Sequence, residues 1–250
     1  MDKSSIQCLF GKELTSCFLV AEAGASHTGL KSAMNLVDIA VDAGFDAVKF
    51  QRIDAEKIDS KDEMFGAYCR YDIIKQRCLT EVEWVLLEKY CEDKIFFFTT
   101  IAEPTTRWAE TYKIASRWLK DLDLIENVSK NCNILQIDTG GASLMDVVKA
   151  IDVMKSDCIV HYCPTGYPAK SENLRTIKKY KDMFKCPIAY SSHGREIEPD
   201  IMALALGVCM IEKPIIEWES ESISPEAEYA LLGREAKIWV SKIIRCQTKL

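Results

Sequence analysis

The chain has 250 residues, of which 48% are hydrophobic and 28% charged, and its formal net charge is -6. This length supports one sizeable core, and α/β barrels commonly reach it as a single domain. The negative charge argues against binding to nucleic acid, which needs a basic face. No apolar run approaches the roughly 18 residues of a membrane span, and no signal-peptide core begins the chain, so we expect a cytoplasmic protein without a membrane partner.

The first strong pattern is a short apolar run within Phe18–Ala23, which continues into small, turn-forming residues. Such a run predicts a buried strand whose end opens into a loop. Helix-like apolar spacing follows over Leu30–Gly44, and Ala47–Gln51 predicts a second strand. These elements make one βαβ unit of the parallel type. Residues 1–16 before it are expected to form a short strand or hairpin that caps the barrel.

The same unit recurs along residues 17–250. The predicted strands are Phe18–Ala23, Ala47–Gln51, Ile95–Thr100, Tyr112–Ser116, Ile134–Thr139, Cys158–Cys163, Ile188–His193 and Val208–Ile215. The clearest later helices are Thr80–Glu92, Ser143–Met154, Glu172–Phe184, Glu198–Leu206 and Pro225–Ile244. The polar stretch Arg52–Leu79 is expected to form a long loop over one end. Eight such units, with no G-x-G-x-x-G after any strand, predict a closed (β/α)8 TIM barrel rather than an open sheet.

Eleven cysteines are spread over the chain, and no two have C-x-x-C spacing. The closest pair is Cys158 and Cys163, with C-x4-C spacing. An odd number without zinc-ribbon spacing indicates reduced thiols that serve as small hydrophobic side chains rather than a metal or redox centre.

Polar residues gather where the predicted strands end, and barrel enzymes build their sites at those ends. These residues are Glu22, Lys49, Gln51, Thr99, Thr100, Lys113, Ser116, Asp138, Thr139, the segment from Tyr162 to Tyr167, Ser191, His193, Glu212 and Lys213. Ammonium groups with hydroxyls suit a small, highly anionic ligand, although a strand-end lysine can also be salt-bridged. An acid can serve as general base and a histidine as metal ligand. His161 is interpreted as a core histidine, whereas His27 either fills its turn or acts.

Several segments form a recognisable series that covers nearly the whole chain in order. They are Val20–Gly29, Ala43–Gln51, Phe98–Thr100, Tyr112–Ser116, Asp138–Gly140, Tyr162–Cys163, Tyr167–Pro168, Ser191–His193, Glu196–Glu198, Ala203–Gly207 and Ile211–Lys213. This series resembles the sialic acid (N-acetylneuraminate) synthases. That family condenses phosphoenolpyruvate with an N-acetylated aldose such as N-acetylmannosamine, giving a nine-carbon keto acid and phosphate.

The resemblance implies a role for each matching residue on the phosphoenolpyruvate side of the site. Lys49 and Lys113 would bind the carboxylate and phosphate of phosphoenolpyruvate. Hydroxyl side chains would assist them, namely those of Thr100, Ser116 and Ser191. Glu22 would be the acid/base group near the reacting carbons. The resemblance thus implies a transferase that forms a carbon–carbon bond.

On the sugar side, Gln51 would help to place the aldose and Tyr167 would contact it. His193 would be one of two histidine ligands to a divalent metal, manganese or magnesium, that polarises the sugar aldehyde. The second histidine of the family is Pro214 here. Glu212 or Glu217 would take its place, which favours a hard ion such as magnesium.

Other departures from the family lie around the same mouth. Asp138 stands where the family has a serine, in a pocket for an anion. The Gly-Pro-Asp loop that carries a sugar-binding acid is absent from Glu217–Ser224. We also expect no C-terminal antifreeze-like domain, which in the family supplies an arginine to the partner subunit. A homodimer remains compatible with the resemblance.

Three functions stay open at this point. The first is a synthase-like enzyme acting on phosphoenolpyruvate and an amino-sugar aldose. The second is a metal-free aldolase in which Lys49 or Lys113 forms a Schiff base, which requires a lowered lysine pKa. The third is a barrel that has lost catalysis and acts as a binding or scaffold protein.

Overall fold

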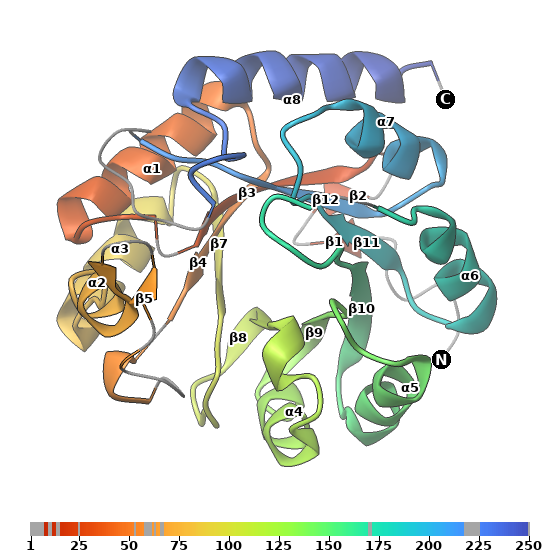
Figure 1. Ribbon diagram of the computed structural model, residues 1–250, viewed down its shortest axis with the longest axis horizontal. Helices are drawn as coiled ribbons and strands as arrows, with labels where there is room; N and C mark the ends of the chain where they lie inside the picture. Colours follow the sequence, from red (N-terminus) through yellow and green to blue (C-terminus); the bar gives the residue numbers. More distant parts are fainter. Residues whose placement is uncertain are drawn as a thin grey trace.

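Eight parallel strands form a closed ring in the computed structural model of this chain, and helices surround the ring (Figure 1). The structure describes residues 8–9, 12–13, 16–24, 26–52, 54–57, 62, 64–65, 68–169, 172–217 and 226–249. The ring order is β10-β11-β12-β3-β4-β7-β8-β9, so each strand lies beside the next one in the chain and β12 closes on β3. The predicted TIM barrel is confirmed.

The ring strands are β3 (Phe18–Gly24), β4 (Ala47–Gln51), β7 (Phe96–Thr100), β8 (Ala109–Ile114), β9 (Cys132–Asp138), β10 (Asp157–Tyr162), β11 (Ile188–Ser191) and β12 (Met210–Pro214). Each overlaps one predicted strand. The largest shift is in β8, which begins at Ala109 because that residue already pairs with Cys132. Ser116, predicted as its last residue, begins the 3-10 turn η2 (Ser116–Trp118) instead. Since β11 ends at Ser191, His193 lies in the loop after it.

The helices are α1 (Leu30–Ala43), α2 (Arg70–Lys75), α3 (Glu81–Cys91), α4 (Leu122–Ser129), α5 (Leu144–Val153), α6 (Arg175–Met183), α7 (Glu198–Ala205) and α8 (Gly233–Gln247). Thr80 and Ser143 cap α3 and α5, because each hydroxyl accepts the backbone N–H of the third residue of its helix. Asp121 caps α4, because its carboxylate accepts the backbone N–H of Leu124. Helix α4 is not among the clearest helices that the sequence predicts. Among the described residues, no helix is long and apolar enough to cross a membrane.

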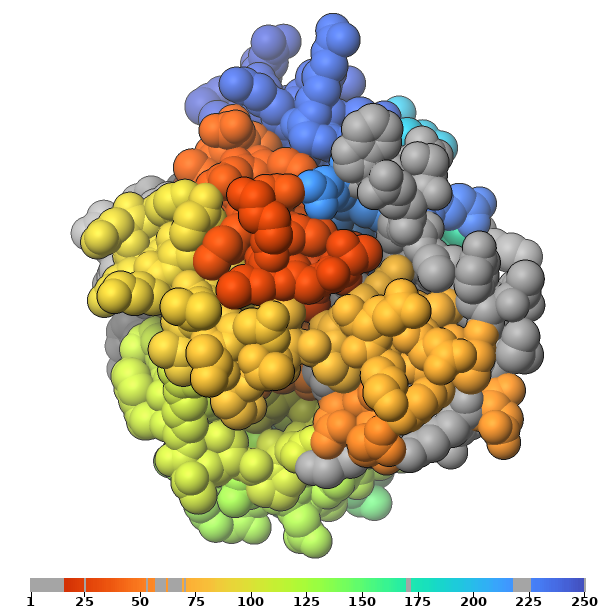
Figure 2. Space-filling model, turned by 90° about the vertical axis from the view of Figure 1, so that its left-hand side faces the viewer, coloured from red at the N-terminus to blue at the C-terminus, as the bar shows by residue number. Residues whose placement is uncertain are grey.

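Two short hairpins accompany the ring. Strands β1 (Cys8–Leu9) and β2 (Lys12–Glu13) pair antiparallel, which confirms the N-terminal hairpin, although most of residues 1–16 lie outside the described part. The long polar stretch after β4 contains the turn η1 (Ala55–Lys57), the hairpin of β5 (Met64–Phe65) and β6 (Tyr68–Cys69), and α2. Figure 2 faces the side of the molecule where α2 and α3 lie, beside the chain before α1.

The last helix begins later than predicted. Pro225, the expected first residue, lies outside the described residues, and residues 226–229 form a turn. Leu231 then pairs with Ile215, and its N–H donates to the carbonyl of Pro214 at 2.8 Å. This pairing holds the backbone extended, so α8 starts only at Gly233. The turn is thereby fixed to the carboxyl end of β12.

The apolar core has two parts. The larger lies between the ring and the helices, and the smaller fills the amino-terminal half of the barrel interior with Phe18, Val20, Ala47, Phe98, Ile134, Ile159, Ala189 and Met210. The ten cysteines whose side chains are described are all free, as predicted. Because these described residues fill the amino-terminal half of the barrel interior, a site is expected at the carboxyl end.

Candidate active site

The inward-facing side chains become polar at the carboxyl ends of the strands, directly after the inner apolar cluster. On β3, Phe18 and Val20 are followed two residues later by Glu22, and on β12 Met210 is followed by Glu212. Residues two apart in a strand share one face, so this step carries the polar side chains inward. The same step leads to Lys49 on β4, Thr100 on β7, His161 on β10 and Ser191 on β11, and on β9 two such steps lead from Ile134 through Gln136 to Asp138.

A cavity of about 310 Å³ opens at this end of the barrel. Its wall contains the predicted residues Glu22, Lys49, Gln51, Thr100, Ser116, Asp138, Tyr167, Ser191, His193 and Glu212. Lys113, the remaining predicted residue, is fully buried and contacts three members of this wall. The structure therefore brings Lys113 and these ten wall residues to one place, whereas Lys213, another strand-end residue of the sequence, pairs with Asp200 instead.

The two lysines meet at a single carboxylate oxygen. Lys49 Nζ lies 3.1 Å from Glu212 Oε2, and Lys113 forms an ion pair with the same oxygen. Lys113 Nζ also lies 2.9 Å from Asp138 Oδ1 and 3.0 Å from Ser191 Oγ, and Lys49 pairs with Glu22. Two ammonium groups and three carboxylates thus form one buried network.

This network shifts the pKa of Glu212, Asp138 and Lys49 in the direction that favours their charged forms. Burial raises the pKa of Glu212, but Lys113 and Lys49 outweigh burial and hold that pKa well below its usual range. Burial also raises the pKa of Asp138, and Lys113 turns the shift downward. For Lys49, burial lowers the pKa, yet Glu212 and Glu22 hold it well above its usual range. Glu22 differs, because burial raises its pKa despite the Lys49 ammonium.

Several buried polar atoms of the wall have no hydrogen-bond partner among the described residues. They are Glu22 Oε1, Thr100 Oγ1 and Glu212 Oε1. Leaving such an atom unsatisfied costs about 1–3 kcal/mol, so sites of this kind are typically completed by a ligand or water. Ser116 Oγ accepts the N–H of Gly140 at 2.9 Å, and a Cβ on Gly140 would lie only 2.8 Å from that oxygen. Glycine is therefore required there to place the Ser116 hydroxyl.

His161 lies on β10 behind the residues that line the cavity, and it is fully buried, as predicted for a core histidine. Its Nε2 lies 2.8 Å from Gln136 Oε1, and its Nδ1 lies 3.3 Å from Ser191 Oγ. Burial lowers its pKa to about 3, so the ring is neutral at pH 7. His161 therefore belongs to the core and also supports Ser191.

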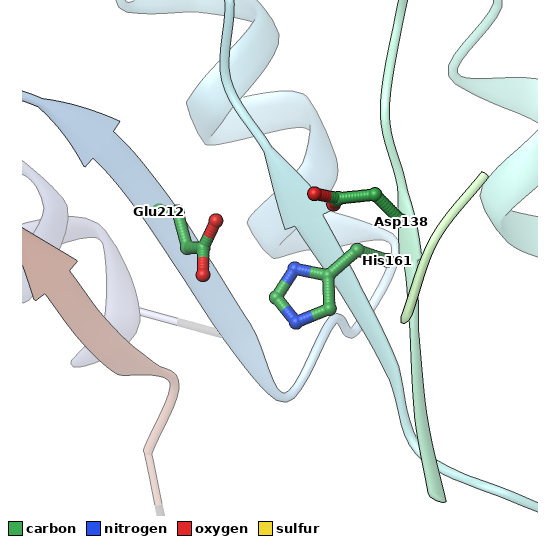
Figure 3. A group of neighbouring side chains, drawn as sticks. All are labelled: Asp138, His161 and Glu212. Carbon is green, nitrogen blue, oxygen red and sulfur yellow. The ribbon is translucent and has the colours of Figure 1, made fainter. Parts of the chain in front are cut away.

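Asp138, His161 and Glu212 point toward one another, with ligand atoms within 4.8 Å (Figure 3). Carboxylates and imidazole are donors that manganese and magnesium accept. The Lys113 ammonium, however, already contacts both carboxylates. A dication roughly 4 Å from an ammonium is repelled by about 8 kcal/mol at an effective dielectric constant of about 20. With Lys113 in place, these three residues fit its ammonium better than a metal ion.

His193 and Glu212, the residues expected to hold the metal, both line the cavity. The His193 ring lies 4.6 Å from the Tyr167 ring, its Nε2 is 3.7 Å from Cys163 Sγ, and burial lowers its pKa to about 4. Glu217 is held by Ser32 and Asn35 on α1, so it does not replace the missing histidine at Pro214. Metal binding by His193 and Glu212 stays a prediction.

Sequence reasoning missed one acid of the wall, Glu226. It lies in the turn before α8, where no strand periodicity marks it, and the sequence had assigned it to the helix itself. His27, whose role was left open, is buried against Phe50 with ring centroids 5.8 Å apart and fills its turn. Neither position carries a spacing signal that would have decided its role.

A parallel (β/α)8 barrel with lysines, carboxylates and hydroxyls around a cavity at the strand ends has the organisation of a barrel enzyme. The profile of the NeuB family matches residues 36–250. The chain belongs to the NeuB family, and the resemblance seen in the sequence is confirmed.

Two relatives and one solved structure show what the chain is similar to. An uncharacterised protein of Methanocaldococcus jannaschii is 31% identical in an alignment 212 residues long, which covers 78% of this chain and 61% of that protein. The N,N'-diacetyllegionaminic acid synthase of Campylobacter jejuni is 28% identical over 92% of this chain and 76% of its own length. A crystal structure of N-acetylneuraminic acid synthetase from Leptospira borgpetersenii, in complex with citrate, superposes with a TM-score of 0.87 at 27% identity, covering 97% of this chain and 88% of that one.

Proposed function

We propose that this chain condenses phosphoenolpyruvate with an N-acetylated aldose similar to N-acetylmannosamine, giving a nine-carbon keto acid and phosphate. The observation that carries the proposal is the meeting of Lys49 and Lys113 at one carboxylate oxygen in the cavity wall. Relatives named as sialic and legionaminic acid synthases support the reaction type. The citrate bound to the Leptospira protein shows that a relative accepts a multiply charged anion.

In this proposal the buried network exchanges partners when phosphoenolpyruvate binds. Lys49 and Lys113 turn part of their hydrogen bonding from Glu212 and Asp138 to the phosphate and carboxylate of the ligand. The Thr100 hydroxyl then gains the partner that it lacks. Glu22, whose pKa burial raises, takes a proton from the water that adds to the reacting carbon.

The Schiff-base alternative is disfavoured by the charge around Lys49. An amine nucleophile needs a lowered pKa. Burial acts in that direction on Lys49, but Glu212 and Glu22 outweigh it and hold the pKa of Lys49 well above its usual range. Reaction with pyruvate and borohydride is therefore expected to leave the mass of the protein unchanged.

The test is phosphate release by the purified protein supplied with phosphoenolpyruvate and N-acetylmannosamine, with and without manganese. Heavy oxygen placed in the C–O–P bridge should appear in the released phosphate, because carbon–oxygen cleavage leaves that atom on phosphorus. Lys113→Met should abolish release, whereas Lys120→Met, at an exposed lysine, should not. Failure to release phosphate with any N-acetylated aldose would overturn the proposal, and binding of phosphoenolpyruvate without turnover would instead favour a binding barrel.

A further inference from the structure

Three side chains from different elements converge above Gly24, at the end of β3. The position that a Cβ on Gly24 would take lies 3.1 Å from Glu226 Oε2, 3.2 Å from Glu22 Oε1 and 3.6 Å from Gln51 Nε2. The backbone of Gly24 has φ of +49°, a conformation that glycine adopts easily. The absence of a side chain there lets two carboxyl groups and an amide approach one corner of the cavity.

Glu226 is held firmly in this corner by its own turn. Its carbonyl accepts the N–H of Tyr229 at 3.1 Å and that of Ala230 at 2.7 Å. The chain then pairs with β12 through Leu231 and Pro214. The residue as a whole is half-buried, but its Oε2 atom is closed off from solvent. The turn therefore aims a carboxyl group at the cavity.

The surroundings favour a protonated Glu226. Burial raises its pKa to about 8, and repulsion from Glu22 adds to the effect. Glu212 repels it as well, whereas Lys49 and Arg77 oppose the shift. Of the two adjacent acids, Glu22 is the one that forms an ion pair with Lys49. Two carboxyl groups so placed share one proton, and here Glu226 holds it while Glu22 stays ionised.

We infer that Glu226 is a catalytic acid of the condensation, donating its proton to the carbonyl oxygen of the acceptor aldehyde. The inference rests on the proposed function. As the methylene carbon of phosphoenolpyruvate bonds to the aldehyde carbon, the carbonyl π electrons take the proton and Glu226 becomes a carboxylate. Glu22 removes a proton from the water that adds to the resulting cation. Collapse of that adduct breaks the carbon–oxygen bond, its hydroxyl proton leaves with phosphate, and Glu22 returns its proton to Glu226.

This role fits a corner in which Pro214 replaces one of the two histidines that the resemblance implies. Pro214, which stands where the resemblance expects a second histidine, lines the cavity together with Glu226 and His193. The remaining donor set is occupied by the Lys113 ammonium. A hydrogen-bond donor aimed at a developing alkoxide stabilises it as a Lewis acid does. Glu226 in the turn thus supplies a donor to the developing alkoxide, in place of the metal ligand that Pro214 at the end of β12 does not provide.

Glu226→Gln tests the inference, with Glu228→Gln as the matched control in the same turn, where the side chain is exposed. Glutamine has the shape of a protonated glutamate but cannot give up a proton. We expect kcat for condensation to fall by at least about 100-fold while the KM for phosphoenolpyruvate stays within about twofold. In the unsubstituted protein, activity should fall as pH rises through about 8, and this basic limb should disappear in Glu226→Gln.

A readout without turnover accompanies the kinetics. The infrared band of a protonated carboxyl group should vanish as pH rises through about 8, and it should be absent from Glu226→Gln but present in Glu228→Gln. If the unsubstituted protein turns over and Glu226→Gln keeps its rate, or if the band is unchanged by that substitution, the inference is wrong and the proposed function stands. If the unsubstituted protein releases no phosphate with any aldose, the proposed function and this role for Glu226 both fail.

Discussion

Replacing Asp138 with serine should make the site bind phosphoenolpyruvate more tightly. The Asp138 carboxylate lies 2.9 Å from Lys113 Nζ and accepts a hydrogen bond from Ser191 at 2.9 Å. It therefore occupies two of the groups that we propose for the ligand. The family resemblance places a serine at this position, so Asp138→Ser restores a neutral side chain that still offers a hydroxyl.

The size of the effect follows from the charge removed. A carboxylate about 5 Å from a phosphate charge is repelled by about 3 kcal/mol at an effective dielectric constant of about 20. Part of this gain is lost because Asp138 also helps to hold Lys113 in place. We expect a net gain of at least about 1.4 kcal/mol, which is a tenfold lower Kd. Lys113 keeps its pair with Glu212, so the fold should tolerate the change.

Titration calorimetry with phosphoenolpyruvate measures this directly. Asp157→Ser is the matched control, because Asp157 begins β10 at the opposite end of the barrel. It removes the same charge from the chain and should leave the Kd unchanged. A Kd for Asp138→Ser that equals or exceeds that of the unsubstituted protein would show that Asp138 does not compete with the ligand, and the charge argument would be refuted.

Three further changes probe the same network. Lys113→Met leaves Asp138 without its ammonium partner and Glu212 with Lys49 alone, so the free energy of unfolding in urea should fall by about 3–5 kcal/mol. No loss relative to exposed Lys120→Met would contradict the pairing. The pKa of Glu212 is lower in the folded protein, so Glu212 contributes to the free energy of unfolding above its unfolded pKa of about 4.3, and this contribution is lost as pH falls below that value. Glu212→Gln should therefore reduce the loss of unfolding free energy at acid pH. An equal loss in this variant would refute the pKa shift. Because the Lys113 ammonium occupies the group of Asp138, His161 and Glu212, manganese should not raise the Tm of His193→Ala, and a rise in that variant would show that these three residues bind metal despite Lys113.

The barrel could be predicted because each strand repeats a local pattern. Runs of about four to eight residues of apolar or alternating sequence, bounded by turn residues, are a signal that short-range sequence carries. The site followed from the same periodicity, since Glu22 and Glu212 lie two residues after inner apolar residues of their strands. The expected meeting of Lys49 and Lys113 is therefore a consequence of register and closure rather than of any single motif.

Pairings inside the cavity could not be predicted in this way. The sequence offers Glu22, Asp138 and Glu212 as equivalent strand-end acids, and only closure of the ring shows that Glu212 is the one shared by both lysines. Glu226 was missed for a different reason. Its position depends on the pairing of Leu231 with Ile215, a contact between distant residues that overrides the helical pattern of the segment.

The acids and the lysines of the site stabilise one another's charges. Two buried ammonium groups would be costly to leave unpaired, so Glu212, Asp138 and Glu22 stabilise them in the ligand-free protein. Each of these carboxylates also opposes an anionic ligand. A fourth ionised acid would add to that opposition, and the proton that Glu226 holds at neutral pH avoids it. A site that binds a highly charged anion can therefore accommodate four acids, provided that some of them pair with lysines and one stays neutral.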